Sequence, residues 1–492
     1  MTRDERLTPA KRDLLDRWRS GQVALEDRPI PPRDRGRPAP LSVQQQRFWL
    51  LEQLTPGTSA YQLTFAAWLR GPLDVSALAL AVAELVRRHE SLRTTFRAAA
   101  EGPVQVIEDE PRARLQVLDA PAPRRGRPGA VLPHHPGTPP PGGREIGGRD
   151  EAVRLLTTAA REPFDLERGP LARMQLVRLD YDLHLFAITV HHLVSDGWSL
   201  GVALTELRWL YERFASGERP DLPPPALQYA DVAAWQRGWL EEGRWRAGLP
   251  WWRERLAGIE PLALPVVRAR PASPSLRCHS RPLTLSAELS GRLRDLGRQE
   301  GATPFMTLLA GYVALVALET GQTAFAVGSP TANRPRAETF GVIGVFINSL
   351  VLRVDLSGEP TFRELVRRVR AVCLEALAHQ DVPFEELVED LRIGRDPGRS
   401  PLFQALFVLQ NSPMPELGFG AARMEPVELA SGSCMVDLEV HLWDREPEIG
   451  GRLNASADVF DGPTADRLAE RLVAVLGLMA AQPDRRAGVE GG

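Results

Sequence analysis

The sequence predicts an α/β (α+β) protein made of two lobes. Segments with helical and strand-like hydrophobic patterns are interleaved through both halves of the 492-residue chain. Neither half carries a glycine-rich phosphate-binding loop between a strand and a helix. A chain of this length exceeds what one hydrophobic core normally serves. Two α/β lobes of about 200 residues each are therefore the simplest architecture.

Composition and proline content set the expected boundaries. Residues 1–40 are charged and end in arginine- and proline-rich sequence, which predicts an extended N-terminal linker. The first lobe is expected over residues 41–225. Within it, residues 121–150 are rich in proline, glycine and arginine without periodicity, which predicts a disordered surface insert. Residues 226–280 are expected to connect the lobes, and residues 281–486 to form the second lobe.

Hydrophobic periodicity and capping residues place the individual elements. Helices are expected at residues 42–54, 75–89, 151–161, 200–211, 229–239, 251–256, 286–299, 304–318, 362–377 and 463–480. Strands are expected at residues 63–69, 104–108, 172–179, 183–190, 283–285, 324–327, 347–354, 403–410, 437–442 and 452–457. Asp74 is expected to cap the second of these helices, and Ser199 the fourth.

Composition excludes several classes of protein. The net charge is −3 and the pI is about 6.4, which does not suggest a nucleic-acid binder. Cys278, Cys373 and Cys434 are scattered without motif spacing, which fits a reducing compartment and no disulfide framework. Charged residues follow Met1, and the longest uncharged apolar run, Phe305 to Leu318, is too short to cross a bilayer. A cytoplasmic protein without a membrane partner is expected.

The stretch from Leu183 to Ser199 carries the candidate chemistry. Its first half is apolar on both faces, which predicts a strand covered on both sides. The strand ends in His191 and His192, whose side chains must point to opposite sides. Asp196 and Gly197 follow at a turn before a helix. A strand that delivers a histidine into such a turn is a common place for catalysis, although a structural role for the histidines stays open.

No metal site is expected at these histidines. A third ligand at a suitable interval is absent, and the sequence contains no cysteine pair with metal-binding spacing.

Seven motifs in one order resemble those of the condensation domains of non-ribosomal peptide synthetases. The resemblance covers roughly residues 41–486. The central motif, His-His-x-x-x-Asp-Gly, stands at residues 191–197. The other six are Leu-Ser-Val-Gln-Gln-Gln-Arg-Phe-Trp at 41–49, Arg-His-Glu-Ser-Leu-Arg-Thr-Thr-Phe at 88–96, Tyr-Ala-Asp-Val-Ala-Ala-Trp at 229–235, Ile-Gly-Val-Phe-Ile-Asn-Ser at 343–349, His-Gln-Asp-Val-Pro-Phe-Glu at 379–385 and Arg-Asp-Pro-Gly-Arg-Ser-Pro-Leu at 395–402.

The resemblance implies a fold and a reaction. Two chloramphenicol-acetyltransferase-like lobes would form a V-shaped pseudo-dimer with a central tunnel. Donor and acceptor peptidyl carrier proteins would bring thioesters on their phosphopantetheine arms, and the chain would bind no cofactor of its own. The acceptor α-amine would attack the donor thioester. An adjacent adenylation domain is an expected partner. The chain shows no carrier or adenylation motif, so it is expected to be one domain of, or beside, a larger assembly line.

The resemblance also assigns roles to residues. His192 is the expected base or positioner of the amine, with His191 beside it. The N–H of Gly197 is a candidate donor to the oxyanion. Asp196 is expected to hold the loop through an arginine, with Arg334 favoured over Arg93.

Four further residues are expected at the tunnel or the lobe interface: Ser195, Trp198, Asn348 and Ser349. Asn348-Ser349 stands where the family has Asn-Thr, a change that keeps the hydroxyl.

Other functions stay open on this sequence. One is an acyltransferase that uses coenzyme A or a free amine, because a fold does not settle a function. Another is a non-catalytic domain that recruits partner enzymes, although such domains tend to lose the second histidine, which this chain keeps. The motif wording is most like the subtype that joins two L-residues. Epimerisation and heterocyclisation fit less well, the latter because aspartate would replace the histidines.

Overall fold

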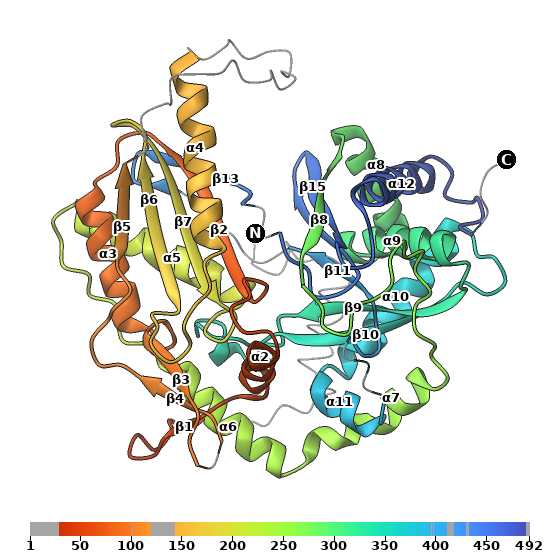
Figure 1. Cartoon of the computed structure of the whole chain (residues 1–492), viewed down its shortest axis with the longest axis horizontal. Helices are drawn as coiled ribbons and strands as arrows, with labels where there is room; N and C mark the ends of the chain where they lie inside the picture. The colour runs from red at the N-terminus through yellow and green to blue at the C-terminus, as the bar shows by residue number, and fades with distance from the viewer. Residues whose placement is uncertain are drawn as a thin grey trace.

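The computed structural model describes residues 29–100, 102–119, 143–394, 396, 398–410, 418–429 and 432–488. These residues form two lobes, each built on its own six-stranded mixed sheet, with α2 (Val43–Leu54) between them in the view of Figure 1. The predicted α/β class is therefore confirmed. Most of the expected helices and strands lie within a few residues of their predicted bounds.

The sheet of the first lobe is centred on the strand that carries the histidines. Its order is β12-β13-β2-β7-β6-β5, and only β5 and β6 run parallel. The strand bounds are Gln62–Arg70 for β2, Leu115–Asp119 for β5, Ala172–Arg178 for β6, Leu183–His191 for β7, Gly418–Phe419 for β12 and Ala422–Val427 for β13. All nine residues of β7 are buried, as its apolar faces predict.

Helices cover both faces of this sheet. On one face α3 (Val75–Arg88) and α5 (Gly197–Ala215) form an apolar cluster with alternate strand residues. On the other face α4 (Gly143–Ala160) packs through Ala152 and Leu156. Asp74 caps α3 as predicted, because its carboxylate accepts the N–H groups of Ser76 and Ala77.

The second lobe repeats this layered plan. Its sheet has the order β10-β9-β11-β14-β15-β8. The strands are β8 (Cys278–Leu285), β9 (Ala324–Thr331), β10 (Asn348–Asp355), β11 (Ala405–Leu409), β14 (Leu438–Arg445) and β15 (Glu448–Ser456). The helices are α8 (Ala287–Gln299), α9 (Pro304–Thr320), α10 (Phe362–Ala378), α11 (Phe384–Asp390) and α12 (Gly462–Ala481).

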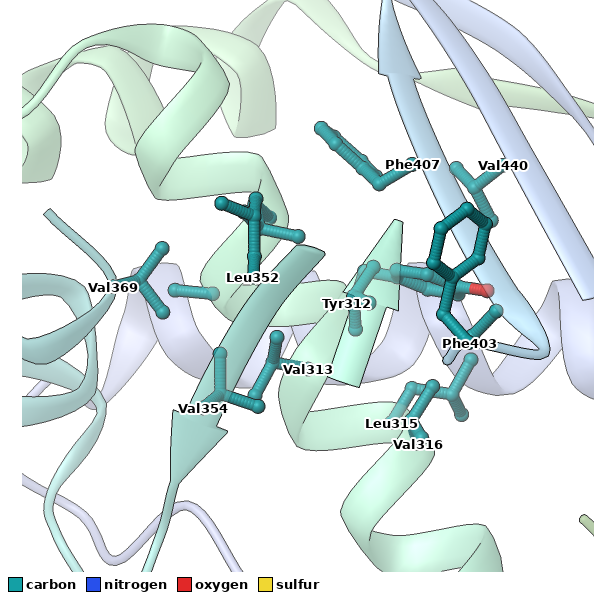
Figure 2. Close-up of a cluster of buried hydrophobic side chains, with 14 of the residues drawn as sticks. Tyr312, Val313, Leu315, Val316, Leu352, Val354, Val369, Phe403, Phe407 and Val440 are labelled. Atoms are coloured by element: carbon teal, nitrogen blue, oxygen red, sulfur yellow. The ribbon is translucent and has the colours of Figure 1, made fainter. Parts of the chain in front are cut away.

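The apolar run predicted to be a buried helix is the centre of this lobe. Tyr312 and Val313 of α9 lie among Leu352 of β10 and Phe407 of β11 (Figure 2). The Tyr312 hydroxyl donates to the carbonyl oxygen of Leu438 at 3.0 Å, so the one polar atom of this side chain is satisfied. Within the described residues no single helix is long and apolar enough to cross a membrane. Only α8 and α9, bent by 106°, pass that test as a pair.

Residues 29–40 are not the extended linker that was expected. Ala39–Pro40 forms β1, which joins β4 (Val104–Ile107) and β3 (Thr94–Arg97) in a small antiparallel sheet. Arg33 is paired with Glu90 at 2.9 Å and with Asp231 at 3.0 Å. These contacts fasten the segment to the first lobe and to α6 (Tyr229–Glu241). Residues 1–28 of the predicted linker lie outside the described residues.

The predicted insert is shorter than expected at its C-terminal end. Residues 121–142 lie outside the described residues, whereas residues 143–150 form the first turns of α4. The glycine content and the lack of periodicity in this segment suggested that the helix begins later, since glycine disfavours helix. A tertiary contact offsets this low helix propensity, because the Arg149 guanidinium lies 5.7 Å from the centre of the Trp68 ring.

One segment of the second half of the chain crosses to the first lobe. Strands β12 (Gly418–Phe419) and β13 (Ala422–Val427) extend the sheet of the first lobe, with Arg423 opposite Arg70 of β2. The Phe419 ring packs edge-on to Phe186 and Tyr211. The sequence boundary at residues 281–486 did not anticipate this crossover.

Candidate active site

The two adjacent histidines point in opposite directions, as predicted for residues leaving a strand. His191 is 1% exposed and lies edge-on to the ring of Phe164, with the ring centres 6.2 Å apart. His192 is partly exposed and stacks on Phe48 of α2, with ring centres 4.9 Å apart and planes within 2°. Of the two residues, only His192 is partly exposed, and stacking holds its largely enclosed ring in place.

The tautomer of His192 follows from its neighbour in the turn. Its Nδ1 lies 3.2 Å from the carbonyl oxygen of Ser195, and a carbonyl oxygen only accepts hydrogen bonds. Nδ1 therefore carries the proton of the neutral ring, and the lone pair is on Nε2. Burial lowers the pKa of His192 to about 4, with a further contribution from His191, and these outweigh the raising effect of Asp196. The imidazole is thus neutral at pH 7 and able to accept a proton from an amine.

His191 and Ser195 shape the turn from inside the protein. Nδ1 of His191 accepts the backbone N–H of Leu193 at 3.1 Å. The Ser195 side chain is buried, and its hydroxyl lies 3.4 Å from the carbonyl oxygen of Asp196. Ser195, expected at the tunnel or the lobe interface, is buried, and its carbonyl rather than its hydroxyl reaches His192.

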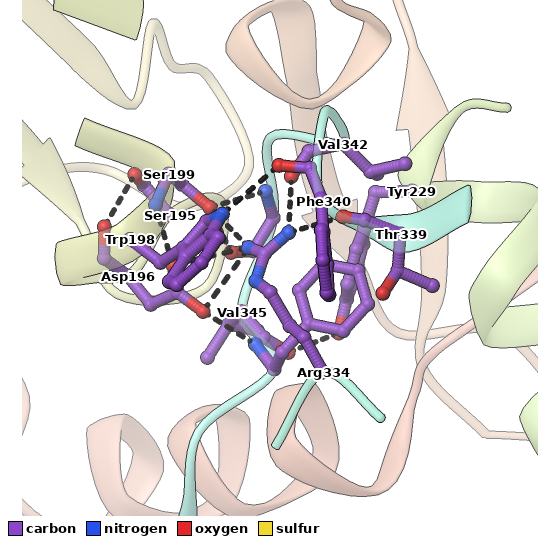
Figure 3. A network of polar contacts seen from close by, with 12 residues as sticks. Ser195, Asp196, Trp198, Ser199, Tyr229, Arg334, Thr339, Phe340, Val342 and Val345 are labelled. Carbon is purple, nitrogen blue, oxygen red and sulfur yellow. Dashed lines mark hydrogen bonds and ion pairs between the residues drawn. The ribbon is translucent and has the colours of Figure 1, made fainter. Parts of the chain in front are cut away.

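Asp196 is held by Arg334 of the second lobe (Figure 3). One guanidinium nitrogen of Arg334 lies 3.2 and 3.4 Å from the two carboxylate oxygens, and both side chains are almost fully buried. The carboxylate also accepts the N–H groups of Ser199 at 2.8 Å and Phe346 at 2.9 Å. The oxygens of the Asp196 carboxylate are therefore engaged by donors from both lobes.

The Arg334 guanidinium is itself fixed by the second lobe and by α5. Its Nη1 donates to the carbonyl oxygens of Thr339 and Val342 at 2.5 and 2.8 Å, and its Nη2 donates to the Ser199 hydroxyl at 2.7 Å. The Phe346 ring centre lies 3.8 Å from the guanidinium carbon. Burial lowers the pKa of Arg334 against the opposing effect of Asp196. The pair therefore joins the histidine turn to the other lobe.

The helix after the turn begins earlier than predicted. Asp196 is the N-cap of α5, and Gly197 is its first residue. Ser199, the predicted cap, is the third residue, and its hydroxyl bonds to the backbone of Gly344 in the second lobe. The N–H of Gly197 has no acceptor within the helix, because the first residues of any helix lack one. Gly197 is partly exposed, and its N–H lies at the positive N-terminal end of α5.

Comparison with known proteins decides the family. The family model described as "Condensation domain" matches residues 37–132 and 142–489. The chain belongs to the condensation domain family. Such domains of non-ribosomal peptide synthetases are amide-bond-forming acyltransferases.

Relatives and solved structures agree with this assignment. The chain is 36% identical over 475 residues to chondramide synthase cmdD of Chondromyces crocatus, a match that covers 96% of the chain and 12% of the relative. It is 37% identical over 492 residues to phosphinothricin tripeptide synthetase PhsC of Streptomyces viridochromogenes, a match that covers 98% of the chain and 43% of the relative. The chain therefore spans less than half of the length of either relative.

Among solved structures, the X-domain from teicoplanin biosynthesis is similar, with a TM-score of 0.79 and 31% identity. The match covers 94% of this chain and 99% of that one.

Arg93 of this condensation domain is not a partner of Asp196. Its Nη1 donates to the carbonyl oxygen of Glu108, where β3 and β4 pair. Of the two candidate partners of Asp196, the favoured Arg334 makes the contact and the runner-up Arg93 does not. The motif at residues 88–96 instead supplies structural contacts: Glu90 pairs with Arg33, and His89 lies 2.9 Å from Glu206.

The three other residues expected at the tunnel or interface differ in their contacts. Trp198 and Ser349 contact the opposite lobe, and Asn348 bonds within its own lobe. The Trp198 indole donates to the carbonyl oxygen of Phe340 in the second lobe at 2.9 Å. Asn348 donates to the carbonyl oxygens of Gln380 and Val382, both at 2.8 Å, so it braces the second lobe from within. The Ser349 hydroxyl accepts from Arg47 of α2 at 3.3 Å, a contact between lobes.

Sequence reasoning about single residues missed several members of the site. The Tyr229 hydroxyl donates to the carbonyl oxygen of Val345 at 2.5 Å and lies 2.7 Å from the Ser42 hydroxyl. Gln45 donates to the carbonyl oxygen of Leu193 in the histidine turn at 3.0 Å. All of these lie inside the quoted motifs, which was the available indication of their importance. A pocket adjoins the network and shares Tyr229 and Phe346 with it.

Among the described residues no group of three histidine, cysteine, aspartate or glutamate side chains is arranged to hold a metal ion.

Proposed function

We propose that this condensation domain joins a donor acyl or peptidyl thioester to the α-amine of an acceptor aminoacyl thioester. Both substrates would be carried on the phosphopantetheine arms of peptidyl carrier proteins. The observation that carries the proposal is the neutral His192 ring, whose Nε2 lone pair is free while Nδ1 is bound to Ser195. The family assignment supplies the reaction class.

The chain's own part in the reaction begins with the amine. The amine nitrogen forms a bond to the donor carbonyl carbon, the carbon–sulfur bond breaks, and the donor arm leaves as a thiol. The amine loses one proton overall, and Nε2 of His192 is placed to accept or orient it. Holding both thioesters beside this ring is the larger effect, worth ~7 kcal/mol or more.

The oxyanion of the tetrahedral intermediate needs a hydrogen-bond donor. The N–H of Gly197 is the proposed donor, because it opens α5 and has no partner within the helix. Asp196 does not act as an acid in this scheme. Its carboxylate holds the turn against Arg334, Ser199 and Phe346.

The wider assembly is also part of the proposal. A V-shaped arrangement of the lobes with a central tunnel would admit the two carrier proteins from opposite ends. An adjacent adenylation domain would load the acceptor carrier. The motif wording favours two L-configured residues as substrates, and the chain would need no cofactor beyond the arms that the carriers bring.

The test is direct synthesis. The purified chain is mixed with a donor carrier and an acceptor carrier, each loaded from a panel of aminoacyl groups, and the acceptor carrier is followed by intact-protein mass spectrometry. The acceptor is expected to gain the mass of the donor aminoacyl group. Equal product with wild type and with His192→Ala across the panel would refute catalysis by this site.

A second candidate function is recruitment of a partner enzyme without catalysis. It is favoured by the likeness to the X-domain from teicoplanin biosynthesis, which has also been solved in complex with OxyB. The intact His192 and its hydrogen-bonded tautomer favour catalysis instead. An acyltransferase that uses coenzyme A or a free amine is the third. Efficient turnover of free thioesters without carriers would favour it.

A further inference from the structure

Two buried polar atoms beside the active histidine face each other without any other hydrogen-bond partner. Nε2 of His191 and Oε2 of Glu52 lie 3.7 Å apart. Neither has a hydrogen-bond partner among the described residues, and the side chains are 2% and 8% exposed. Leaving such groups unpaired costs ~1–3 kcal/mol each, so native proteins rarely keep them without a reason.

The described surroundings of Glu52 offer its free oxygen no other partner. Glu52 belongs to α2, and its second oxygen, Oε1, accepts the N–H of Gly57 at 3.3 Å. The nearest cation on this helix, Arg47, is paired with Glu385 at 3.2 Å. The Tyr61 hydroxyl lies 3.5 Å from the Thr55 hydroxyl. Nε2 of His191 is thus a polar atom that faces this oxygen and, among the described residues, also lacks a hydrogen-bond partner.

The proton of His191 must lie on the nitrogen that faces Glu52. Nδ1 of His191 accepts the N–H of Leu193 at 3.1 Å, so it carries the lone pair. In the neutral ring Nε2 is then the donor, and its hydrogen is directed at a carboxylate that has a free acceptor. The separation of 3.7 Å is longer than a hydrogen bond, so the inferred contact requires the two side chains to approach each other by roughly 0.5 Å.

This places the two histidines in opposite tautomers, linked through one turn. His191 carries its hydrogen on Nε2 and accepts the backbone N–H of Leu193 on Nδ1. His192 carries its hydrogen on Nδ1 and donates it in a hydrogen bond to the carbonyl oxygen of Ser195, which leaves the lone pair of Nε2 free. Leu193 and Ser195 belong to the same short turn. The state of His191 therefore sets the shape of the turn that orients His192.

We propose that Glu52 is a positioning residue for the condensation reaction: its carboxylate accepts Nε2–H of His191, and His191 thereby fixes the turn that keeps the lone pair of His192 on Nε2. This inference rests on the proposed function only for its effect on rate. The tautomers themselves are a property of the protein without substrate. Glu52 does not touch the reacting atoms.

Three variants test the proposal. Glu52→Leu removes the acceptor, and Glu52→Gln keeps an amide oxygen that accepts Nε2–H. Glu319→Gln is the matched control, because its carboxylate is equally buried but pairs with Arg467 and Arg471 in the second lobe. With loaded carriers, Glu52→Leu is expected to lower kcat roughly 10- to 100-fold with KM unchanged, because small misplacements of a catalytic group have effects of this size. Glu52→Gln is expected to stay within about threefold, and Glu319→Gln to match wild type.

The second readout needs no substrate. Ring-nitrogen NMR shifts of chain labelled with ¹⁵N-histidine are expected to show His191 protonated on Nε2 and His192 on Nδ1, with His191 becoming a mixture of tautomers in Glu52→Leu. Wild-type His191 protonated on Nδ1, or Glu52→Leu with unchanged kcat and shifts, would overturn the proposal. If Glu52→Leu does not fold, the wild-type shifts and Glu52→Gln decide, and a loss of rate in Glu52→Gln with unchanged tautomers would also overturn it. If wild type makes no product, the shifts test Glu52 while the proposed function alone fails.

Discussion

The Asp196 carboxylate and the Arg334 guanidinium meet at 3.2 Å although 138 positions separate them in the chain. The first residue caps a helix of one lobe, and the second extends from the loop after β9 of the other lobe. Because both are buried, removing one partner would leave a charge without compensation, which costs more than breaking a surface ion pair. It explains why the turn that bears His192 depends on both lobes.

Removing either partner of this pair is expected to destabilise the protein. Asp196→Ala and Arg334→Ala should each lower the free energy of unfolding by ~3–5 kcal/mol, because each leaves an uncompensated buried charge. The double variant should lose less than the sum. Denaturant unfolding measures all three, with Glu212→Ala of an exposed pair as control, expected within ~0.5 kcal/mol of wild type. Asp196→Asn with an unchanged melting temperature but no turnover would move Asp196 into the chemistry.

Loss of the His192 ring should affect the reaction far more than the fold. His192→Ala is expected to lower the rate of product formation roughly 10²-fold or more, since it removes the proton acceptor. His379→Ala is the matched control, because that ring is also stacked on an aromatic residue, Trp251, in the second lobe. Single-turnover mass spectrometry should show near wild-type rates for this control. Equal rates in both variants would contradict the role of His192.

The lowered pKa of His192 makes a signed prediction about pH. The ordinary pKa near 6.5 applies in the unfolded chain, and the folded value is about 4, so the unfolded chain binds more protons between these values. Stability is therefore lost as pH falls from 6.5 toward 4. Between about pH 7 and pH 5 the titration of this residue alone should lower the free energy of unfolding by about 2 kcal/mol.

Denaturant unfolding of wild type and His192→Gln at about pH 7 and pH 5 isolates this contribution. Wild type is expected to lose about 2 kcal/mol more than the variant, and parallel losses would show that His192 titrates normally. In the pH profile of the reaction rate, the fall on the acid side that is due to protonation of His192 should correspondingly lie near pH 4.

The crossing strand should contribute strongly to stability. Phe419 is 1% exposed and packs on Phe186 and Tyr211 of the first lobe. Phe419→Ala is therefore expected to cost ~3–5 kcal/mol in chemical denaturation. Tyr181→Ala provides the comparison, because Tyr181 is 78% exposed, and its loss should be within ~0.5 kcal/mol. A loss below about 1 kcal/mol for Phe419→Ala would mean that the crossover is only loosely attached.

Local sequence patterns predicted those elements that are determined by the properties of neighbouring residues. The strand over residues 183–191 was visible because both of its faces are apolar, and Asp74 was visible as a cap because its side chain serves the next N–H groups. The partnership of Asp196 with Arg334 was predicted from the resemblance to the condensation family, since spacing alone offered no way to pair residues so far apart.

Features that depend on distant contacts were missed. Residues 422–427 include a proline and alternate weakly, so nothing marked them as a strand that completes the sheet of the other lobe. The expected cap, Ser199, is a reasonable choice by residue type, but the longer carboxylate of Asp196 reaches its N–H from three residues earlier. Glu52 attracted no attention, because its significance arises only when His191 is folded against it.

The crossover of β12 and β13 also orders events in time. Strand β2 is paired on one edge with β7, but its other edge receives β13, whose Arg423 lies opposite Arg70. A ribosome that adds about 5–20 residues per second needs roughly 20 to 70 s to travel from one to the other. Throughout that interval the nascent first lobe presents an open strand edge, the kind of surface on which chains pair wrongly. The emerging polypeptide therefore keeps an aggregation-prone edge until β13 has been made.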